Sequence, residues 1–361
     1  MAESVMSRFG PRQVQWHYEH GLVLQSIFLL GQTAKQDKYC RYVKEMYDSM
    51  ISPEGEIRSY REGEYNLDQI NPGKTLFLLL NQYGEEKYRK AIEILREQLR
   101  SHPRTNSGGF WHKQIYPRQM WLDGLYMQGP FYAQYAKEFG SGADFQDITR
   151  QFSLIEEKTR DAKTGLLCHA WDESLSQKWA DTNTGCSPHF WGRALGWYCM
   201  ALADTLDFIP PAYSEQAETL KAIARRLFSP LLKYQDDDTG LWFQVLDRGD
   251  APGNYTESSA SSMFVYFLLK MARLKVASES ETVSIKTAAG KAYQGLLKNK
   301  IQEDPSGELH LSGICKVAGL GGKPYRDGSY EYYVGEPQAV DDFKGVGPFI
   351  LASMEYENMP S

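Results

Sequence analysis

The chain has 361 residues, of which 42% are hydrophobic and 24% charged, so it can bury a sizeable core and its composition excludes intrinsic disorder. Its net charge of −6 argues against nucleic-acid binding, which needs a basic face, although local basic residues could still bind a small anion. The aromatic share of 13% is unusual. Because Trp and Tyr rings pack in cores and also stack on sugars, this composition is compatible with an ordinary core and with a carbohydrate site.

No segment is expected to enter or cross a membrane. The N-terminal stretch, MAESVMSRFGPRQVQW, lacks the apolar centre of a signal peptide, and no run of about 20 apolar residues follows. The cysteines have no CxxC pairing and no metal-ligand spacing, which favours free thiols in a reducing compartment. These cysteines are Cys40, Cys168, Cys186, Cys199 and Cys315. We therefore expect a cytoplasmic protein that contacts no membrane and holds no metal.

A turn motif recurs along the chain, with a glycine followed by an apolar or aromatic residue, as in SPEGEI, NSGGFW, AKTGLL, DDTGLW and PSGELH. The turn glycines are predicted to be Gly55, Gly109, Gly165, Gly240 and Gly307. After each turn comes a polar and aromatic loop, then an apolar helix-like stretch, and in most copies a second, more charged one. The repeat therefore predicts a series of helical hairpins.

Two kinds of helix are predicted to alternate. The first is apolar on nearly all sides, as in RALGWYCMALADTL, and such helices are buried. These stretches are residues 14–33, 67–82, 121–138, 190–207, 258–274 and 346–357. The second is amphipathic, as in YRKAIEILREQL, and belongs on a surface. These stretches are residues 36–50, 85–100, 143–159, 213–234 and 282–299. A twelfth helix is not evident, and residues 1–12 are the candidate for part of it.

Six buried helices alternating with five surface helices predict an all-α, two-layered ring of helical hairpins, forming one domain over residues 1–361. An open solenoid is the alternative, but these repeats are longer and less regular than solenoid repeats. In a closed ring the glycine turns gather at one mouth. We therefore expect a functional site at that mouth, in the loops that lead into the buried helices.

Two aspartates are candidates for acid–base chemistry: Asp123 in WLDGLYM, beside Trp121 and with Met127 on the next turn, and Asp68 in NLDQINPGKTL. Burial among aromatic side chains favours the protonated form of a carboxyl group, because the charge loses its hydration. A protonated acid and a second carboxylate are the usual equipment of glycoside cleavage. The alternative is that each aspartate only begins a helix, where the macrodipole favours an acidic residue.

Arg193 lies between Trp191 and Trp197 in HFWGRALGWY, a run otherwise suited to a core. Because Arg is rarely buried without an anionic partner, it is a candidate for binding a substrate carboxylate through its bidentate fork. A structural ion pair with a neighbouring Asp is the alternative. His169 in LLCHAWDES and His189 in SPHFWGRALGW are more commonly hydrogen-bonded structural residues than catalytic ones.

The other charged clusters have simpler interpretations. Lys113 follows His112 in WHKQIYPRQM, and Lys113 and Lys344 would ordinarily be solvated. The Asp341–Asp342 pair is typical of a helix cap. The chain has no GxSxG elbow, GxGxxG or P-loop motif, or HExxH motif, which excludes serine-hydrolase, nucleotide-binding and zinc-protease classes.

These clusters, in this order, resemble the unsaturated rhamnogalacturonyl hydrolases of glycoside hydrolase family 105. The resemblance rests on NLDQINPGKTL, YPRQMWLDGLYMQGPF, CHAWDES, FWGRALGWY and VGEPQAVDDFKGVGPFILASMEY, and extends from about residue 14 to the C-terminus. It implies an (α/α)6 barrel, no metal or organic cofactor, and short anionic pectin fragments as substrates. Those fragments carry a C4=C5 unsaturated uronic acid attached to rhamnose.

The resemblance also implies a mechanism. An acid protonates C4 of the vinyl ether, water adds at C5, and the resulting hemiketal opens to release the second sugar. Asp123 matches the family's proton donor, and Asp68 its second aspartate. His169 and Arg193 match the uronate subsite, and Trp191 and Trp197 the stacking residues. The residues expected to contact substrate are therefore His112, Lys113, Trp121, Met127, His169, His189, Trp191, Arg193 and Trp197.

Three other functions remain open from the sequence. The related unsaturated glucuronyl hydrolases of family 88 share the barrel and act on glycosaminoglycan fragments. Sugar epimerases also use helical toroids, and a non-catalytic sugar-binding ring is the third alternative. The expected partner in every case is a small sugar, and we expect a monomer.

Overall fold

The computed structural model describes residues 1–359, in which thirteen α-helices form most of the ordered structure. Six of them build an inner ring, and five others cover it from outside. The inner helices are α2 (Tyr18–Thr33), α4 (Gly73–Tyr83), α6 (Leu122–Glu138), α8 (Gly192–Leu206), α10 (Ser258–Arg273) and α13 (Phe343–Glu357). The outer helices are α3 (Asp37–Asp48), α5 (Glu86–Ser101), α7 (Gly142–Thr159), α9 (Ser214–Lys233) and α11 (Glu279–Asn299).

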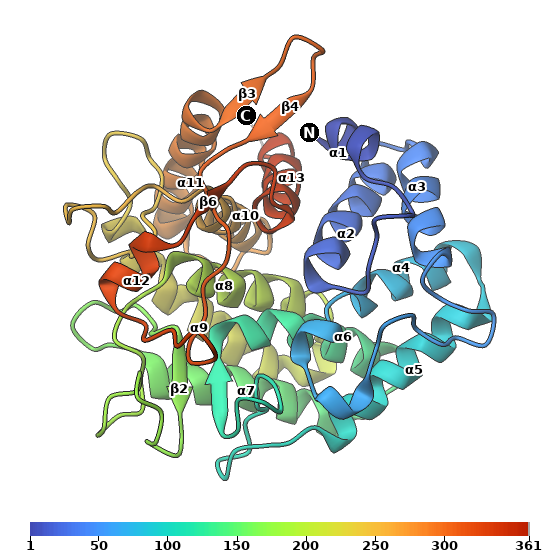
Figure 1. The fold of residues 1–361 in the computed structure, drawn as a ribbon, viewed down its shortest axis with the longest axis horizontal. Coiled ribbons are helices and arrows are strands. Elements are labelled where there is room, and N and C mark those ends of the chain that lie inside the picture. The colour runs from blue at the N-terminus through green and yellow to red at the C-terminus, as the bar shows by residue number, and fades with distance from the viewer. Residues whose placement is uncertain (360–361) are drawn as a thin grey trace.

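The ring is closed. Each inner helix packs against the next one along the chain, and α13 packs against α2. Each of the five outer helices packs against the inner helix that precedes it, so that consecutive pairs are hairpins. The first and last inner helices lie side by side in Figure 1, in blue and red. The predicted (α/α)6 barrel is thus confirmed, and the open solenoid is excluded.

The inner helices are apolar all round because they contact neighbours on every side. In α8 every residue from Gly192 to Thr205 is buried, and in α10 every residue from Ser258 to Ala272. Small residues let these two helices approach closely. A Cβ atom at Gly196 would lie 2.7 Å from Sδ of Met263 on α10, so only glycine fits there.

The outer helices show the expected amphipathic pattern. In α5 the buried apolar side chains recur every three or four residues and face the inner ring, as a 3.6-residue period requires. They are Tyr88, Ala91, Ile92, Leu95 and Leu99.

Four predicted helix starts were wrong by three to six residues: α2 begins at Tyr18 rather than residue 14, α13 at Phe343 rather than residue 346, and α4 and α11 also differ. The stretch expected to be helical from residue 67 contains the short 3-10 helix η2 (Leu67–Gln69), and α4 begins only at Gly73. Pro72 explains the delay, because a proline disfavours helical geometry in the residue before it and lacks an N–H. The helix expected from residue 282 begins at Glu279, where Ser278 and Glu281 form a capping box.

The N-terminus supplies the twelfth helix, α1 (Ala2–Arg8), as residues 1–12 suggested. It occupies the outer layer between the first and last helical hairpins (Figure 1). On one side the hydroxyl of Tyr39 on α3 donates to Oε1 of Glu3 at 2.6 Å. On the other side Nη1 of Arg8 donates to Oδ2 of Asp341, just before α13, at 2.7 Å.

The recurring turns join outer helices to the following inner helices. Gly55, Gly165, Gly240 and Gly307 have φ between +74° and +88°, which favours glycine. The second copy differs from the prediction: Gly108 has the positive φ of +92°, not Gly109. Gly109 is constrained instead by space, because a Cβ atom there would lie 2.1 Å from Sδ of Met120.

The remaining elements are short and lie in connections. Strand β1 (Gln119–Trp121) pairs antiparallel with β2 (Ala170–Asp172), β3 (Ile301–Glu303) with β4 (Leu309–Leu311), and β5 (Ile314–Cys315) with β6 (Gln338–Ala339). The short helices are η1 (Glu62–Glu64), η3 (Pro211–Tyr213) and α12 (Tyr330–Gly335). None of the helices in residues 1–359 combines the length and apolar character needed to cross a membrane.

Candidate active site

The N-terminal ends of the inner helices converge at one end of the ring, which we call the mouth. There the ring of Tyr18, at the start of α2, lies edge-on to Trp197 of α8 with centroids 6.2 Å apart. Nζ of Lys344, at the start of α13, donates to Oε1 of Glu19 at 2.5 Å. Because a helix N-terminus carries partial positive charge, the mouth favours an anionic ligand.

The pairing of β1 with β2 brings His169 to Asp123. The N–H of Leu122 donates to the carbonyl of His169 at 3.0 Å, and Asp123 is the next residue, in the first turn of α6. Nε2 of His169 lies 3.2 Å from Oδ2 of Asp123. The approach is off the angle of a hydrogen bond, so within residues 1–359 both buried atoms lack a hydrogen-bond partner. Oδ2 is itself buried, while the Asp123 side chain as a whole keeps 14% of its surface exposed.

The other ring nitrogen of His169 contacts a residue that the sequence did not indicate. Its Nδ1 lies 2.8 Å from the hydroxyl of Tyr333, on α12. Both side chains are completely buried. His169 is thus held between Tyr333 and Asp123.

Asp68 is paired with Lys113, which is not solvated as predicted. Nζ of Lys113 lies 2.6 Å from Oδ2 of Asp68, and Nε2 of His112 lies 3.7 Å from Oδ1. Burial would raise the pKa of Asp68, but the ammonium of Lys113 outweighs it and lowers that pKa below its ordinary value. Burial lowers the pKa of His112 to about 4, so this ring is neutral at pH 7. Asp68 is therefore a carboxylate at neutral pH.

Aromatic rings form one wall beside the two aspartates. The Trp121 ring lies nearly parallel to His112, with centroids 4.6 Å apart, and to Tyr116, at 4.8 Å. The ring of His169 meets Trp121 edge-on at 5.2 Å. Tyr116 was not predicted, although YPRQM lies in the same loop; its hydroxyl accepts a hydrogen bond from Arg326 at 2.9 Å.

Arg193 is buried, with 1% of its surface exposed, but no ion pair with an aspartate is formed in the described part of the chain. One guanidinium nitrogen instead donates to the carbonyl of Cys315 and approaches the hydroxyl of Ser259 at 3.4 Å. The guanidinium lies 4.9 Å from the centroid of the Trp191 ring. Its Nε has no hydrogen-bond partner in residues 1–359, so its bonding capacity is incompletely used.

The remaining predicted site residues lie below or beside the group formed by Asp68, Asp123, His169 and Arg193. Trp197 is 1% exposed and stacks on Tyr126, with centroids 5.0 Å apart, and Met127 on the same turn is also 1% exposed. His189 is half-buried and packs edge-on against Tyr330 at 6.2 Å. The structure therefore brings Asp68, His112, Lys113, Trp121, Asp123, His169, Trp191 and Arg193 together more closely than these three.

The interpretation of the last charged cluster was partly wrong. Asp342 is the predicted cap, because its Oδ1 accepts from the N–H of Lys344 at 2.9 Å. Asp341 is not a cap: its φ is +60° and its Oδ1 accepts from the N–H of Leu311. Lys344 is 3% exposed rather than solvated, since its ammonium pairs with Glu19 and Asp342.

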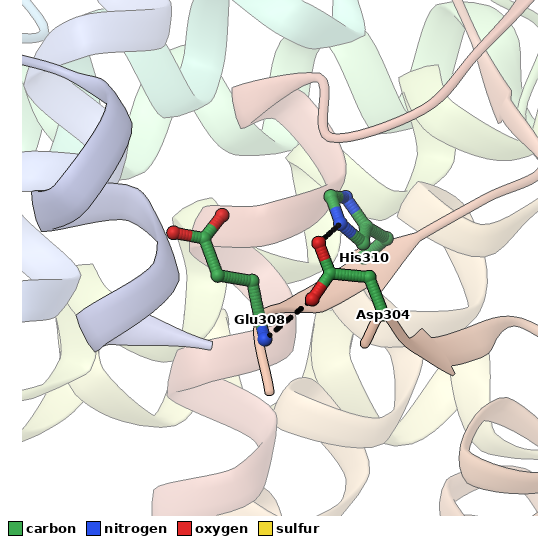
Figure 2. Close-up of side chains that lie close together, drawn as sticks. All are labelled: Asp304, Glu308 and His310. Carbon is green, nitrogen blue, oxygen red and sulfur yellow. Dashed lines mark hydrogen bonds and ion pairs between the residues drawn. The ribbon is translucent and has the colours of Figure 1, made fainter. Parts of the chain in front are cut away.

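Another cluster of titratable side chains lies on the β3–β4 hairpin (Figure 2). Ligand-type atoms of Asp304, Glu308 and His310 lie within 4.8 Å of one another. They already have partners: Nδ1 of His310 lies 2.6 Å from Oδ2 of Asp341, and Glu308 accepts from Ser7 at 2.6 Å. The group is accounted for as the network that fixes α1 to the hairpin.

Comparison with known proteins identifies the family of the chain. The model of Glycosyl Hydrolase Family 88 matches residues 1–360. A family 105 glycoside hydrolase structure from C. acetobutylicum ATCC 824 is 47% identical, with a TM-score of 0.95 over 99% of this chain and 98% of that one. A protein of Agrobacterium fabrum is 43% identical over 63% of this chain and 96% of its own length. The unsaturated rhamnogalacturonyl hydrolase YesR of Bacillus subtilis is 26% identical over 75% of this chain and 76% of its own length. The chain therefore belongs to Glycosyl Hydrolase Family 88 and is a glycoside hydrolase of the family 88 and 105 type.

Proposed function

We propose that the protein releases the unsaturated galacturonic acid from the non-reducing end of short rhamnogalacturonan fragments. The observation that carries the proposal is the Asp123 carboxyl at the mouth, 3.2 Å from His169 and without a hydrogen-bond partner in residues 1–359. The similarity to YesR, whose name gives that activity, supports the choice of substrate.

In this proposal Asp123 acts first as acid and then as base. It donates its proton to C4 of the C4=C5 double bond, and an oxocarbenium ion forms at C5. Water adds at C5 and returns a proton to Asp123. The hemiketal then opens, and the bond to the second sugar breaks, so that one water is consumed for each bond cleaved.

Asp68 has a different role because its surroundings differ. Lys113 keeps Asp68 ionised, so it cannot supply the proton that C4 needs. An ionised carboxylate accepts hydrogen bonds, and we propose that it orients the attacking water or the sugar hydroxyls. Two carboxyl groups with distinct environments are the usual way to divide such tasks.

The uronate carboxylate is proposed to bind among the helix N-termini, with Arg193 as its charged partner. Arg193 is the buried cation beside Trp191, and its Nε is unbonded within residues 1–359. The Tyr116 and Trp121 rings offer the adjoining apolar wall for a sugar ring.

The test is the loss of ultraviolet absorbance of the conjugated uronate when enzyme meets an unsaturated galacturonyl–rhamnose disaccharide. We expect the absorbance to fall and rhamnose to be released. Asp123→Asn should bind the disaccharide yet turn it over at least a hundredfold more slowly. Asp37→Asn, on the exposed face of α3, is the matched control and should act like the wild type.

The main alternative substrate is an unsaturated glucuronyl disaccharide, which the match to Family 88 favours. The same assay decides between them by comparing kcat/KM for the two disaccharides. Mass spectrometry separates both from an epimerase, which would leave the mass of the sugar unchanged. Saturable binding with no chemical change would contradict every hydrolytic assignment.

We further propose that residues 1–361 form one catalytic domain that acts as a monomer in the cytoplasm. The five cysteines, all free thiols, support a reducing compartment. Gel filtration checks the oligomeric state.

A further inference from the structure

We infer that Tyr333 is a positioning residue that stabilises the proton-loaded form of the His169–Asp123 pair, because its hydroxyl can accept a hydrogen bond from Nδ1–H of His169. The inference rests on the proposed function of Asp123 as proton donor. It is motivated by a continuous line of contacts: Tyr333 hydroxyl to Nδ1 of His169 at 2.8 Å, and Nε2 of His169 to Oδ2 of Asp123 at 3.2 Å.

Tyr333 is fixed where this role requires it. Its side chain is completely buried, and its ring lies nearly parallel to Trp191 with centroids 6.0 Å apart. Its carbonyl accepts a hydrogen bond from Nε2 of Gln244 at 3.0 Å. The hydroxyl therefore has little freedom to leave Nδ1 of His169.

The phenol keeps its proton, so it can reverse its role. Burial raises the pKa of Tyr333 well above the ordinary value of a tyrosine. A neutral hydroxyl can donate to a bare Nδ1, or accept from Nδ1–H. The hydroxyl can therefore partner the ring of His169 in both of its protonation states.

The free enzyme has two protonation states of the His169–Asp123 pair. When Asp123 is a carboxylate, neutral His169 is best stabilised with its proton on Nε2, facing Oδ2, while Tyr333 donates to Nδ1. When the pair holds one more proton, that proton lies between Oδ2 and Nε2, and Nδ1–H donates to the Tyr333 oxygen. During turnover the proton leaves Oδ2 of Asp123 for C4 and returns from water, while Nδ1–H of His169 stays bonded to the Tyr333 oxygen. The 3.2 Å contact is expected to tighten when substrate excludes water.

Most groups around the pair keep one protonation state near neutral pH; Cys186 is an exception, because its contact with Cys168 lowers its pKa to about 7. Burial holds the pKa of His112 at about 4, and burial raises the pKa of Cys315. Arg193 stays charged, and Lys113 keeps Asp68 ionised. The charged and titratable groups around Tyr333 and the pair include Asp68, His112, Lys113, Cys168, Arg193, Glu257, Cys315 and Tyr332.

The experiment is the pH dependence of kcat/KM for Tyr333→Phe. In Tyr333→Phe, the His169–Asp123 pair that holds the extra proton has a buried Nδ1–H without an acceptor. The pair that lacks this proton has only an unbonded lone pair on Nδ1 of His169. The loaded form loses more, so the alkaline limb should move to lower pH by about one unit, which is roughly a tenfold loss of rate on that limb. Tyr332→Phe, which removes a hydroxyl bonded to the N–H of Gly319, should keep the wild-type limb.

An equal loss at every pH, or an unmoved limb, would overturn the inference. If Tyr333→Phe does not fold, nitrogen NMR of wild-type protein with labelled histidine decides the matter, with His169 identified by loss of its signal in His169→Asn. We expect the Nε2–H form at pH 8, and the Nδ1–H form would overturn the inference. The NMR result needs no substrate, so it is independent of whether the proposed hydrolysis is observed.

Discussion

Two buried polar groups lie at opposite ends of the same barrel, and they differ in how completely their hydrogen bonds are made. Near the C-terminal ends of α8 and α10, Asp204 accepts from Lys270 at 2.8 Å and from Tyr266 at 2.6 Å, while Lys270 also reaches Asp207 at 2.7 Å. We call these four residues the base cluster. At the mouth, Oδ2 of Asp123 has no hydrogen-bond partner in residues 1–359.

The difference separates stability from function. A buried network whose members are bonded holds the helices in one arrangement, and breaking it leaves an uncompensated charge. A buried polar atom without a partner costs folding free energy, but it can bond a ligand without first giving up a protein partner. Nε2 of His169, Nδ1 of His112 and Nε of Arg193 share this condition with Asp123. The base cluster is therefore bonded throughout, although Nζ of Lys74, which lines the same cavity, has no hydrogen-bond partner in residues 1–359, whereas the central residues of the mouth keep unbonded atoms.

The largest expected effect tests the mouth. Asp123→Asn should lower kcat about 10²- to 10⁴-fold, since it removes the general acid. Its melting temperature should stay close to that of the wild type, because Oδ2 makes no hydrogen bond that could be lost within residues 1–359. The absorbance assay and thermal unfolding measure the two quantities. A large fall in melting temperature would show that Asp123 stabilises the fold, as the base cluster does.

A substitution in the base cluster should have the opposite result, a loss of stability with little loss of kcat. Asp204→Asn weakens the main partner of Lys270 and should lower the free energy of unfolding by about 3–5 kcal/mol, as broken buried pairs do. Denaturant unfolding measures this, and kcat at a temperature where the variant is folded should remain near that of the wild type. Asp238→Asn, in an exposed turn, is the control. A strong loss of kcat without a loss of stability would contradict the assignment of stability to the base cluster and of function to the mouth.

A smaller effect is expected at the mouth's own bonded pair. Because the pKa of Asp68 is lowered in the folded protein, its pairing with Lys113 stabilises the fold above the ordinary pKa of an aspartate. That contribution is lost as pH falls through the lowered pKa. Lys113→Met should therefore cost about 1–3 kcal/mol at pH 7 and progressively less toward pH 3, as measured by denaturant unfolding. A difference that is constant with pH would mean that lost packing, not charge, explains it. The exposed Lys316→Met is the control.

The smallest effect concerns the surface network in Figure 2. Hydrogen bonds to Asp341 and Asp304 raise the pKa of His310, so its protonated form stabilises the folded state. This contribution is present below the ordinary histidine pKa and is lost as pH rises through the raised value. His310→Gln should lower the melting temperature, measured by thermal unfolding, more at pH 5.5 than at pH 8.5. The opposite trend would show that the hairpin is held to α1 without the histidine charge.

Much of the fold could be predicted because the spacing of apolar residues along a helix indicates which of its sides are buried. The all-round apolar runs identified the inner helices, and the amphipathic α5 and α7 identified outer ones. The start of α4 was wrong because Pro72 acts locally against a favourable pattern. The short α1 escaped clear prediction because bonds to Tyr39 and Asp341, distant in sequence, fix it more than its own pattern does.

The site was less predictable, because its geometry depends on the closed ring. Asp68 and Asp123 were proposed from their place before apolar helices, and the pairing of Asp68 with Lys113 was not foreseen. Tyr333 could not have been found from local pattern, since it lies 164 positions from His169 in the chain. Lys344 was misjudged because its partner Glu19 lies at the other end of the chain, 325 positions away.

The closure of α13 against α2 has a consequence for how the molecule folds. Hairpins are local and form early, but the proposed site draws on residues from the second, third, fourth and last hairpins. A half-assembled barrel would therefore have nearly all of its helix signal and no catalytic centre. During refolding, circular dichroism should recover before turnover, and the interval between them would report the joining of the two chain ends.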